Sequence, residues 1–401
     1  MKLLVATDFP PDAPGGGPAI IRQMLRGFPW QIYWWSCRRS LARTSVFPPQ
    51  PVLEHAHASP RRLFPQKRLT RWKAIAMRTL WAPYAAHSLT NFLRKISPDC
   101  VWAIPHDWSI LPLYRVLLRE TPSPLHLHTT IQDFPDIHHH GADWGPKIVS
   151  TLAHQQEALY ANADSADATS LPMLNFLQKR TGKEGVQMLH AGLESEDFHF
   201  LETLASMPPS TGPIRIAYAG TILVEPEFSF FTQLLEKIRA LGVDLRLEFW
   251  STHTYSARPW FRQEWMKEHG HLSEAELMAR LRQCSWGFIP MSFSDQEPRY
   301  NRFSFPTKFI TYLAAGLHIL SLGHPESSLM KMTTAYQVGL QVAKTDLSEA
   351  TSLRVKIALT ENKAKYLPEI LRCARDHFDA EKMKAKLWRC FNASRPCRNS
   401  S

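Results

Sequence analysis

The sequence has no stretch of apolar residues long enough to cross a membrane. A spanning helix needs about 20 consecutive, mostly apolar residues, and no run in the 401-residue chain approaches that length. The opening apolar stretch, Lys2–Thr7, is interrupted by Asp8, so it is too short for a secretory signal peptide. These absences argue against a membrane-spanning or exported protein, and we expect a cytoplasmic location.

Cysteines are few, and none of them is spaced as a metal ligand. No pair has zinc-ligand spacing, and the chain is too long for a small secreted scaffold held by disulfides. Three adjacent histidines, His138 to His140, invite a metal interpretation. Adjacent side chains rarely face one point, however, and no carboxylate or cysteine partner has a suitable spacing, so we expect no metal site there. The cysteines are Cys37, Cys100, Cys284, Cys373, Cys390 and Cys397.

Acidic residues are scarce in one early segment of a basic chain. The formal net charge is +11 and the pI about 9.4, which favours anionic partners. Between Arg22 and Arg78 the only acidic residue is Glu54, and Trp30, Trp34, Trp35, Trp72 and Trp81 lie in or beside this segment. Two interpretations stay open: contact with an anionic membrane surface, which attracts arginine, lysine and tryptophan, or a solvated basic face above buried tryptophans. No helix-turn-helix, zinc or RNA-binding signature is present, so we do not expect nucleic acid as a partner.

Strand-like and helix-like segments alternate along the chain, with no internal repeat and no low-complexity tract. This alternation predicts an α/β protein with parallel sheets covered on both faces, and the length favours two domains. A Pro/Ser/Gly-rich linker at 207–213 divides them into 1–205 and 206–375, followed by a terminal segment, 376–401, whose helix we expect to pack back on the first domain. The predicted strands are Lys2–Thr7, Gln31–Trp35, Pro98–Ile104, Leu125–His128, Ala166–Ser170, Val186–Leu189, Ile214–Ala219, Leu245–Trp250, Trp286–Ile289, Ile319–Leu322 and Leu340–Val342.

The segment from Pro306 to Gly316 indicates an anion site. Proline is tolerated in the first turn of a helix and glycine ends one, so these residues bracket about three helical turns. The exposed amides of the first turn, with Lys308 beside them, favour a phosphate or diphosphate.

Two further features of the first domain indicate ligand contacts. Gly16 and Gly17 precede a helix and have no side chain, so a ligand can approach their amides, although such a run alone is more often a flexible turn. His106 and Asp107 come after the predicted strand Pro98–Ile104, and His128 comes similarly after Leu125-His126-Leu127; strand ends are where α/β sheets bind ligands. A loop histidine without a catalytic role is an equally good interpretation of either.

Four local patterns together resemble the GT-B glycosyltransferases of the retaining group 1 (family 4) class. The resemblance extends over roughly residues 1–390 and is weak over Arg38–Ala76. The matching patterns are Asp8-Phe9-Pro10-Pro11 with Gly15-Gly16-Gly17, the segment Ile131-Gln132-Asp133-Phe134-Pro135-Asp136, the segment from Ala163 through Ala168 to Gly192 and Phe198, and the helix from Ser304 to Gly316.

This resemblance implies two Rossmann-like domains that face a central cleft, with the acceptor side in the first domain and the donor side in the second. It implies a nucleotide-diphosphate sugar as substrate and no essential metal or other cofactor. His106, Lys308 and Asp133 take the catalytic positions, and Asp12 and His128 lie on the acceptor side. The implied donor-binding residues are Gly16, Gly17, Gly220, Thr221, His271, Leu272, Arg302, Pro306, Thr307 and Thr311.

The chain departs from the family pattern at the donor site. Thr221 and Glu225 stand near the places of the arginine and lysine that clamp the diphosphate. Thr311 and Phe303 stand where the family has two glutamates, one for the ribose hydroxyls and one near the sugar. The diphosphate clamp would then have to come from Lys308, from Arg299 or Arg302, or from backbone amides. Glu297 is a candidate substitute for a lost glutamate.

We therefore expect a glycosyltransferase of the hexosyltransferase type that moves a sugar to a cell-envelope glycan or lipid-linked acceptor in polysaccharide biosynthesis. It would work in the cytoplasm, peripherally on the inner face of the membrane. The alternatives are a sugar-nucleotide epimerase of the same fold and a non-catalytic binding protein with a degenerate donor site.

Overall fold

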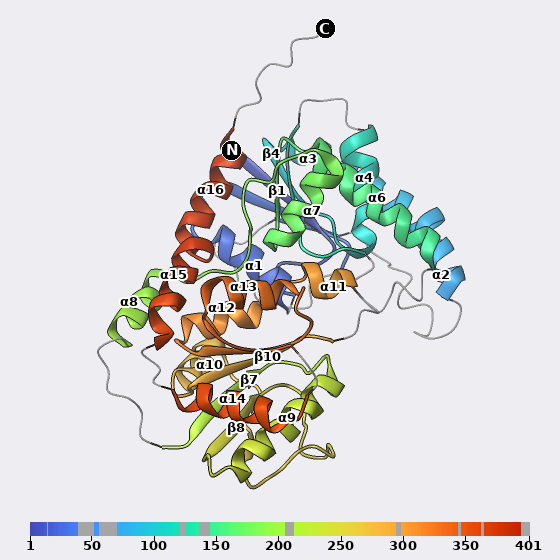
Figure 1. Ribbon diagram of the computed structural model, residues 1–401. Coiled ribbons are helices and arrows are strands. Elements are labelled where there is room, and N and C mark those ends of the chain that lie inside the picture. Colours follow the sequence, from blue (N-terminus) through green and yellow to red (C-terminus); the bar gives the residue numbers. More distant parts are fainter. Residues whose placement is uncertain are drawn as a thin grey trace. The chain divides into compact units, whose positions relative to one another are not determined.

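A computed structural model describes residues 1–13, 15–38, 52–55, 70–120, 125–135, 145–204, 212–293, 298–343, 346–361 and 365–393 (Figure 1). The chain forms two compact units. The first comprises Met1–Ala191 together with Ala380–Ser401, and the second comprises Gly192–Asp379. Each unit contains a six-stranded sheet of parallel strands, as the alternating pattern predicted.

The sheet of the first unit has the strand order β3-β2-β1-β4-β5-β6, and all pairings are parallel. The chain reverses its direction of strand addition between β1 and β4. In open α/β sheets, ligands bind beyond the carboxyl ends of the strands at such a switch point. The strands are β1 (Lys2–Thr7), β2 (Gln31–Ser36), β3 (Val52–His55), β4 (Cys100–Ile104), β5 (His126–Ile131) and β6 (Ser165–Ala168).

Helices cover both faces of this sheet and build two apolar cores. One core contains side chains of α3, α4 and α6, and the other contains side chains of α1 and α16 (Figure 1). In the second core, the Trp388 indole of α16 donates a hydrogen bond to the Met24 carbonyl of α1 at 2.9 Å. The helical segments are α1 (Gly16–Leu25), α2 (Thr70–Ala76), η2 (Met77–Trp81), α3 (Ala82–Ile96), η3 (Asp107–Ser109), α4 (Ile110–Arg115), η4 (Val116–Glu120), α6 (Pro146–Asn162), α7 (Leu171–Thr181) and α16 (Ala380–Asn392).

The second unit repeats this plan with the strand order β12-β11-β10-β7-β8-β9, again all parallel. Its switch point lies between β7 and β10. The strands are β7 (Ile214–Ala219), β8 (Leu245–Trp250), β9 (Met266–Glu268), β10 (Trp286–Pro290), β11 (His318–Leu322) and β12 (Gly339–Val342). The helices are α8 (Ser195–Leu204), α9 (Glu225–Ala240), α10 (Glu274–Leu281), α11 (Pro298–Phe303), α12 (Thr307–Ala314), α13 (Ser328–Tyr336), α14 (Glu349–Thr360) and α15 (Leu367–His377).

The structure differs from the predicted organisation in three places. The division between the units lies at Ala191–Gly192 and not at 205, so α8 belongs to the second unit, where its Leu201 and Leu204 side chains lie against Gly316. The predicted strand Val186–Leu189 is reduced to a single bridge at Met188. The edge strands β3 and β9 were not anticipated, and both are short. The linker at 207–211 and the histidines at 138–140 lie outside the described residues, and among the described ones no helix is long and apolar enough to span a membrane.

A glycine in β10 fixes how α12 packs on the second sheet. A methyl group added to Gly287 would lie 2.2 Å from the Tyr312 ring of α12. The Tyr312 hydroxyl accepts a hydrogen bond from the Ala219 amide of β7 at 2.9 Å, so this ring cannot move aside without losing that bond. Gly287 therefore allows α12 to pack against the end of β7.

We expect Gly287→Ala to lower the free energy of unfolding by about 1–3 kcal/mol, because overpacking of a filled core costs about that much. Denaturant unfolding measures this change. A double-mutant cycle provides the control: once Tyr312→Ala has removed the ring, Gly287→Ala should cost much less. Equal costs in the two backgrounds would show that the contact with the ring is not the reason for the glycine.

Candidate functional site

Lys308 lies at the switch point of the second sheet, close to the end of β7. Its Nζ is 3.4 Å from the Tyr218 hydroxyl and 4.8 Å from the centre of the Tyr218 ring. Gly220 directly follows β7 with a φ of 105°, and a Cβ at this position would lie 3.2 Å from the lysine Cε. Glycine thus supplies both the left-handed backbone and the space that the lysine side chain needs.

The charge of this lysine is poorly solvated. Burial lowers the pKa of Lys308 from its usual 10.5 to about 8. Among the described residues, no carboxylate forms an ion pair with it within 4.0 Å. A desolvated ammonium group gains from a bound anion, because the anion restores the stabilisation that water would supply. The position is therefore a candidate anion site.

The start of α12 adds to this site. Pro306 occupies the N-cap position and makes no side-chain cap hydrogen bond, so the amides of the first turn, starting at Thr307, have no capping side chain. The partial positive charge of a helix N-terminus favours an anion. Pro306, Thr307 and Lys308 are all partly exposed. The predicted anion-binding segment therefore has the backbone geometry that the sequence indicated.

The two residues at the places of the family glutamates contribute no charge here. The Thr311 hydroxyl donates a hydrogen bond to the Thr307 carbonyl of its own helix at 3.4 Å. Phe303 is buried, with 4% of its surface exposed. Arg302 is exposed at the end of α11, and Glu297 lies outside the described residues. Of the predicted cations, Lys308 is the one that the described contacts place beside the end of β7.

The segment after β8 and β9 presents an aromatic pair. His269 stacks on Trp250, with ring centres 5.0 Å apart and 11° between the planes, and it bonds the Glu248 carboxylate through Nε2. The predicted residue His271 is exposed, and Leu272 is partly buried. The flat Trp250–His269 pair was missed by the sequence reasoning. The available signal was a tryptophan that ends one strand and a histidine that follows the next.

The predicted residue Thr221 contributes its backbone. Its carbonyl accepts a hydrogen bond from the Tyr218 hydroxyl at 2.8 Å, while its side chain is exposed beyond Gly220. Because the same hydroxyl also contacts Lys308, Tyr218 connects the loop after β7 to the lysine of α12. The sequence did not single out Tyr218, since it lies inside a strand.

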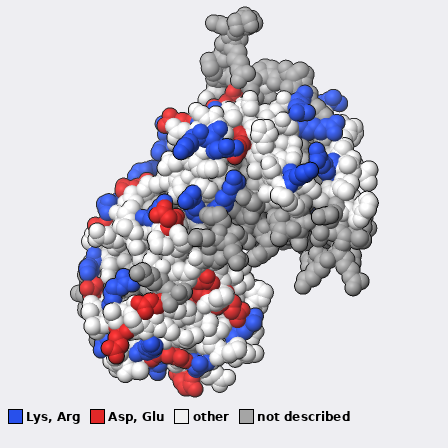
Figure 2. Space-filling model, turned by 45° about the vertical axis from the view of Figure 1, so that its right-hand side comes forward, with Lys and Arg blue, Asp and Glu red and all other residues white. Residues whose placement is uncertain are grey.

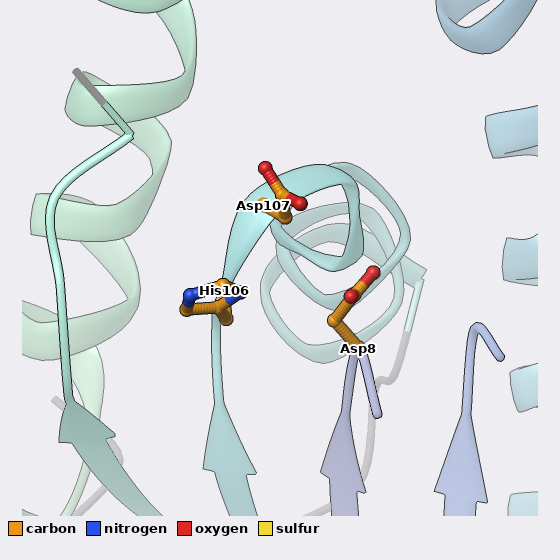
Figure 3. Close-up of side chains that lie close together, drawn as sticks. All are labelled: Asp8, His106 and Asp107. Carbon is orange, nitrogen blue, oxygen red and sulfur yellow. The ribbon is translucent and has the colours of Figure 1, made fainter. Parts of the chain in front are cut away.

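The first unit carries a charged cluster at its own switch point (Figure 3). Asp8 follows β1, and His106 and Asp107 follow β4, with one ligand atom from each of the three within 4.8 Å of the others. The two carboxylates are buried, at 3% and 7% exposure. Arg38 Nη2 lies 2.5 Å from Asp8 Oδ2 and 3.5 Å from Asp107 Oδ2. The guanidinium thus supplies the positive charge that a bound cation would bring.

His106, predicted as a catalytic residue, is therefore part of a larger cluster. Its ring meets the edge of Phe9 with centres 6.2 Å apart, and its backbone is held by the Ser109 hydroxyl. Asp107 adopts a left-handed φ of 54°, which a non-glycine residue rarely does. Asp107 was expected beside His106 at this strand end, whereas Asp8 and Arg38 were not predicted as site residues, although Asp8 directly follows the predicted strand Lys2–Thr7.

The glycine loop of the first unit has a packing role that the sequence did not reveal. A Cβ on Gly17 would lie 2.4 Å from Gln132 Oε1, and Gln132 Nε2 donates to the Gly17 carbonyl at 3.2 Å. The space on the Cβ side of Gly17 is thus filled by Gln132. Gly16 begins α1.

The remaining predicted residues of the first unit lie near its strand ends. Asp12 lies in the loop before α1, which Arg22 holds by donating to the Pro11 and Ala13 carbonyls at 2.8 and 2.9 Å. Asp133 follows β5, is partly exposed, and accepts a hydrogen bond on its backbone carbonyl from Gln156 Nε2 at 2.8 Å. Both stay candidates for polar contacts with a ligand.

The placement of His128 on the acceptor side is corrected by the structure. His128 lies inside β5 and is fully buried. Its Nδ1 is 2.7 Å from the Ser165 hydroxyl and its Nε2 is 3.2 Å from Asp167 Oδ2. Burial alone would lower its pKa, but the Asp167 carboxylate raises the pKa of His128 to about 9. This histidine joins β5 to β6 as a buried ion pair and cannot reach a ligand.

Compared by sequence, the chain matches no protein-family model and no curated protein. Solved structures, in contrast, match over nearly its whole length. A sucrose-phosphate synthase from Thermosynechococcus elongatus matches with a TM-score of 0.70 at 12% identity, covering 98% of each chain. An E. coli trehalose-6-phosphate structure with bound UDP-2-fluoro glucose matches with a TM-score of 0.63 at 14% identity, covering 99% of this chain and 100% of the other. A glycosyltransferase from Rickettsia africae matches with a TM-score of 0.59 at 12% identity, covering 98% of each. The chain has the GT-B fold of these structures, which confirms the predicted fold.

The lowered pKa of the partly buried Lys308 makes a prediction for stability. Its folded pKa of about 8 lies below the unfolded value of 10.5, so the ionised lysine opposes folding below about pH 8, and this opposition fades as the pH rises towards the unfolded pKa. We expect Lys308→Met to raise the thermal midpoint at pH 7, and the gain over the original chain to shrink at higher pH. Lys331→Met, at a lysine that is 47% exposed, is the matched control and should show no such gain. A lower midpoint for Lys308→Met at pH 7 would contradict the assignment of a desolvated charge.

Proposed function

We propose that this chain is a glycosyltransferase that moves a sugar from a nucleotide-diphosphate sugar to a cell-envelope glycan or lipid-linked acceptor, with retention of configuration. The observation that carries the proposal is Lys308, a desolvated cation held beside Gly220 at the start of α12. The GT-B fold supports it, because one structure with that fold is described with UDP-2-fluoro glucose bound. The proposed place of action is the cytoplasm, at the inner face of the membrane.

The proposed reaction needs stabilisation of the leaving group above all. The bond between the anomeric carbon and the diphosphate oxygen breaks, and its electron pair leaves with the diphosphate. Lys308 and the first-turn amides of α12 stabilise the charge that grows there, and such prepared electrostatics is usually the largest catalytic contribution. The acceptor hydroxyl forms the new bond to the anomeric carbon, and its proton passes to the departing phosphate oxygen. No metal and no other cofactor takes part in this proposal.

The other site residues take supporting roles in the proposal. His106 and Asp133 on the first unit are assigned to hydroxyl groups of the transferred sugar, and Asp12 to the acceptor. His269, which is partly exposed and stacks on the buried Trp250, is assigned to the nucleobase, since an aromatic ring held in one orientation offers a flat surface for stacking. Thr311 offers no carboxylate to the ribose hydroxyls.

A second candidate is a non-catalytic protein that binds nucleotide sugars. The observation that favours it is the donor site itself, in which the Thr311 hydroxyl bonds within its own helix and Phe303 is buried. This candidate shares the anion site with the first. Sugar transfer to an acceptor separates the two, because a binding protein would bind the donor without turnover.

We expect Lys308→Gln to weaken nucleoside-diphosphate binding in calorimetry and to lower sugar transfer by at least about 10²-fold, as for the loss of one transition-state donor. In the unchanged chain, diphosphate affinity should fall as the pH rises through about 8, where Lys308 loses its proton. Lys308→Gln should bind with no such pH dependence.

Lys331→Gln, which alters an exposed lysine of α13, is the control and should leave binding and transfer unchanged. Unaltered turnover in Lys308→Gln would remove this lysine from the mechanism. Failure of every nucleoside diphosphate and sugar nucleotide to bind would reject both candidate functions. The anomeric configuration of the product, followed by NMR, tests retention.

A further inference from the structure

One helix of the first unit exposes an unusual row of large apolar side chains. The chain is helical without a break from Thr70 to Ile96, through α2, η2 and α3. The exposed fractions are 65% for Trp72, 49% for Ile75, 72% for Leu80 and 48% for Tyr84. We call these four residues, with the exposed Arg78 between them, the outer face of this helix.

The opposite side of the same helix is also apolar. Ala74, Met77, Trp81, Ala85 and Leu89 are buried in a core of the first unit. A helix on the surface of a globular domain normally buries one apolar stripe and turns polar residues outwards. Because this helix is apolar on both sides, the core accounts for only one of them. The outer face therefore has the composition of a contact surface.

The sequence around the outer face carries charge of one sign. No acidic residue occurs between Glu54 and Asp99. The helix itself carries Arg71, Lys73, Arg78, Arg94 and Lys95 in sequence. On the face of the molecule drawn in Figure 2, lysine and arginine side chains gather at the upper right, away from the acidic ones. An anionic surface is the complementary partner for such a helix.

The side chains on the outer face distinguish between anionic surfaces. Tryptophan and tyrosine favour the headgroup level of a bilayer, and aliphatic side chains enter the acyl boundary below it. Ile75 and Leu80 gain nothing from a nucleic-acid backbone. A second copy of the chain would bring the same positive charges together, which opposes association. Charge and apolarity together fit a lipid surface.

We propose that the outer face of the α2–η2–α3 helix docks on an anionic lipid bilayer, with its apolar side chains at the acyl boundary and its basic residues at the headgroups. The proposal rests on the proposed function in one respect: that function supplies the reason for docking, which is to bring the first unit to a lipid-linked acceptor. Its physical basis is independent of the donor site, because all of its residues lie on a helix of the first unit, whereas Lys308 belongs to the second unit.

The test is co-sedimentation of the full chain with vesicles. We expect binding to phosphatidylcholine vesicles that contain phosphatidylglycerol, and much weaker binding to pure phosphatidylcholine. Binding should weaken between ~0.1 M and ~1 M salt, as the screening length falls from about 10 to about 3 Å. The double variant Trp72→Ser/Leu80→Ser should lower the vesicle partition coefficient by about tenfold or more, because two large side chains no longer leave water.

The chain offers a matched control in Leu353→Ser/Ile357→Ser, which alters two apolar residues of α14 in the second unit that are 52% and 51% exposed. This control should bind vesicles like the unchanged chain. Absence of binding to anionic vesicles, or equal binding by the Trp72/Leu80 variant, would overturn the proposal. The proposal would also be overturned if the unchanged chain were a dimer that does not bind vesicles and the Trp72/Leu80 variant were a monomer. The outer face would then be covered by a second copy of the chain.

Nucleoside-diphosphate binding, measured on the same samples, separates this proposal from the proposed function. The Trp72→Ser/Leu80→Ser variant should bind nucleotide like the unchanged chain, because its altered side chains are exposed and the core beneath them is intact. Retained vesicle binding without any nucleotide binding would reject the proposed function and leave the docking surface standing. Nucleotide binding by a chain that does not bind vesicles would reject the docking surface and leave the proposed function standing.

Discussion

The second unit is built around one constraint, which is the placement of the Lys308 ammonium group at the switch point between β7 and β10. Lys308 needs space beside the end of β7, and Gly220 supplies it by having no side chain and a positive φ. The lysine also needs a fixed helix, and Gly287 allows α12 to approach β10 through Tyr312. Tyr218 then contacts both the lysine and the loop after β7. The position is costly for a charge, and such costs are typical of functional sites.

The switch point of the first unit handles charge in a different way. Two buried carboxylates, Asp8 and Asp107, lie beyond the ends of β1 and β4, and Arg38 lies between them. The second unit leaves a cation without an ion-pair partner among its described residues, whereas here the opposite charges are supplied by the chain itself. Equivalent places in two similar sheets are therefore adapted to different polar contacts.

Histidine shows why sequence position alone is a poor guide to a site. His106 and His128 both follow runs of apolar residues, and both were natural candidates for a ligand contact. The chain leaves the sheet before His106, so its ring lies among charged groups beyond β4. At His128 the strand continues to Ile131, and the ring is fully buried against Asp167. The difference is the length of one strand, and strand pairing with β6 decides it.

The sequence by itself determined the alternating architecture, most of the strands, and the helix bracketed by Pro306 and Gly316, because these depend on local periodicity and on the backbone preferences of proline and glycine. Only the tertiary structure decided which residues meet. The space beside Gly17 is filled by Gln132, which is far away in the sequence, and the lack of a side chain at Gly220 leaves space for Lys308. Trp250 and His269 become a stacked pair through the pairing of β8 with β9. Such contacts depend on the register and order of strands distant in sequence, which no local pattern specifies.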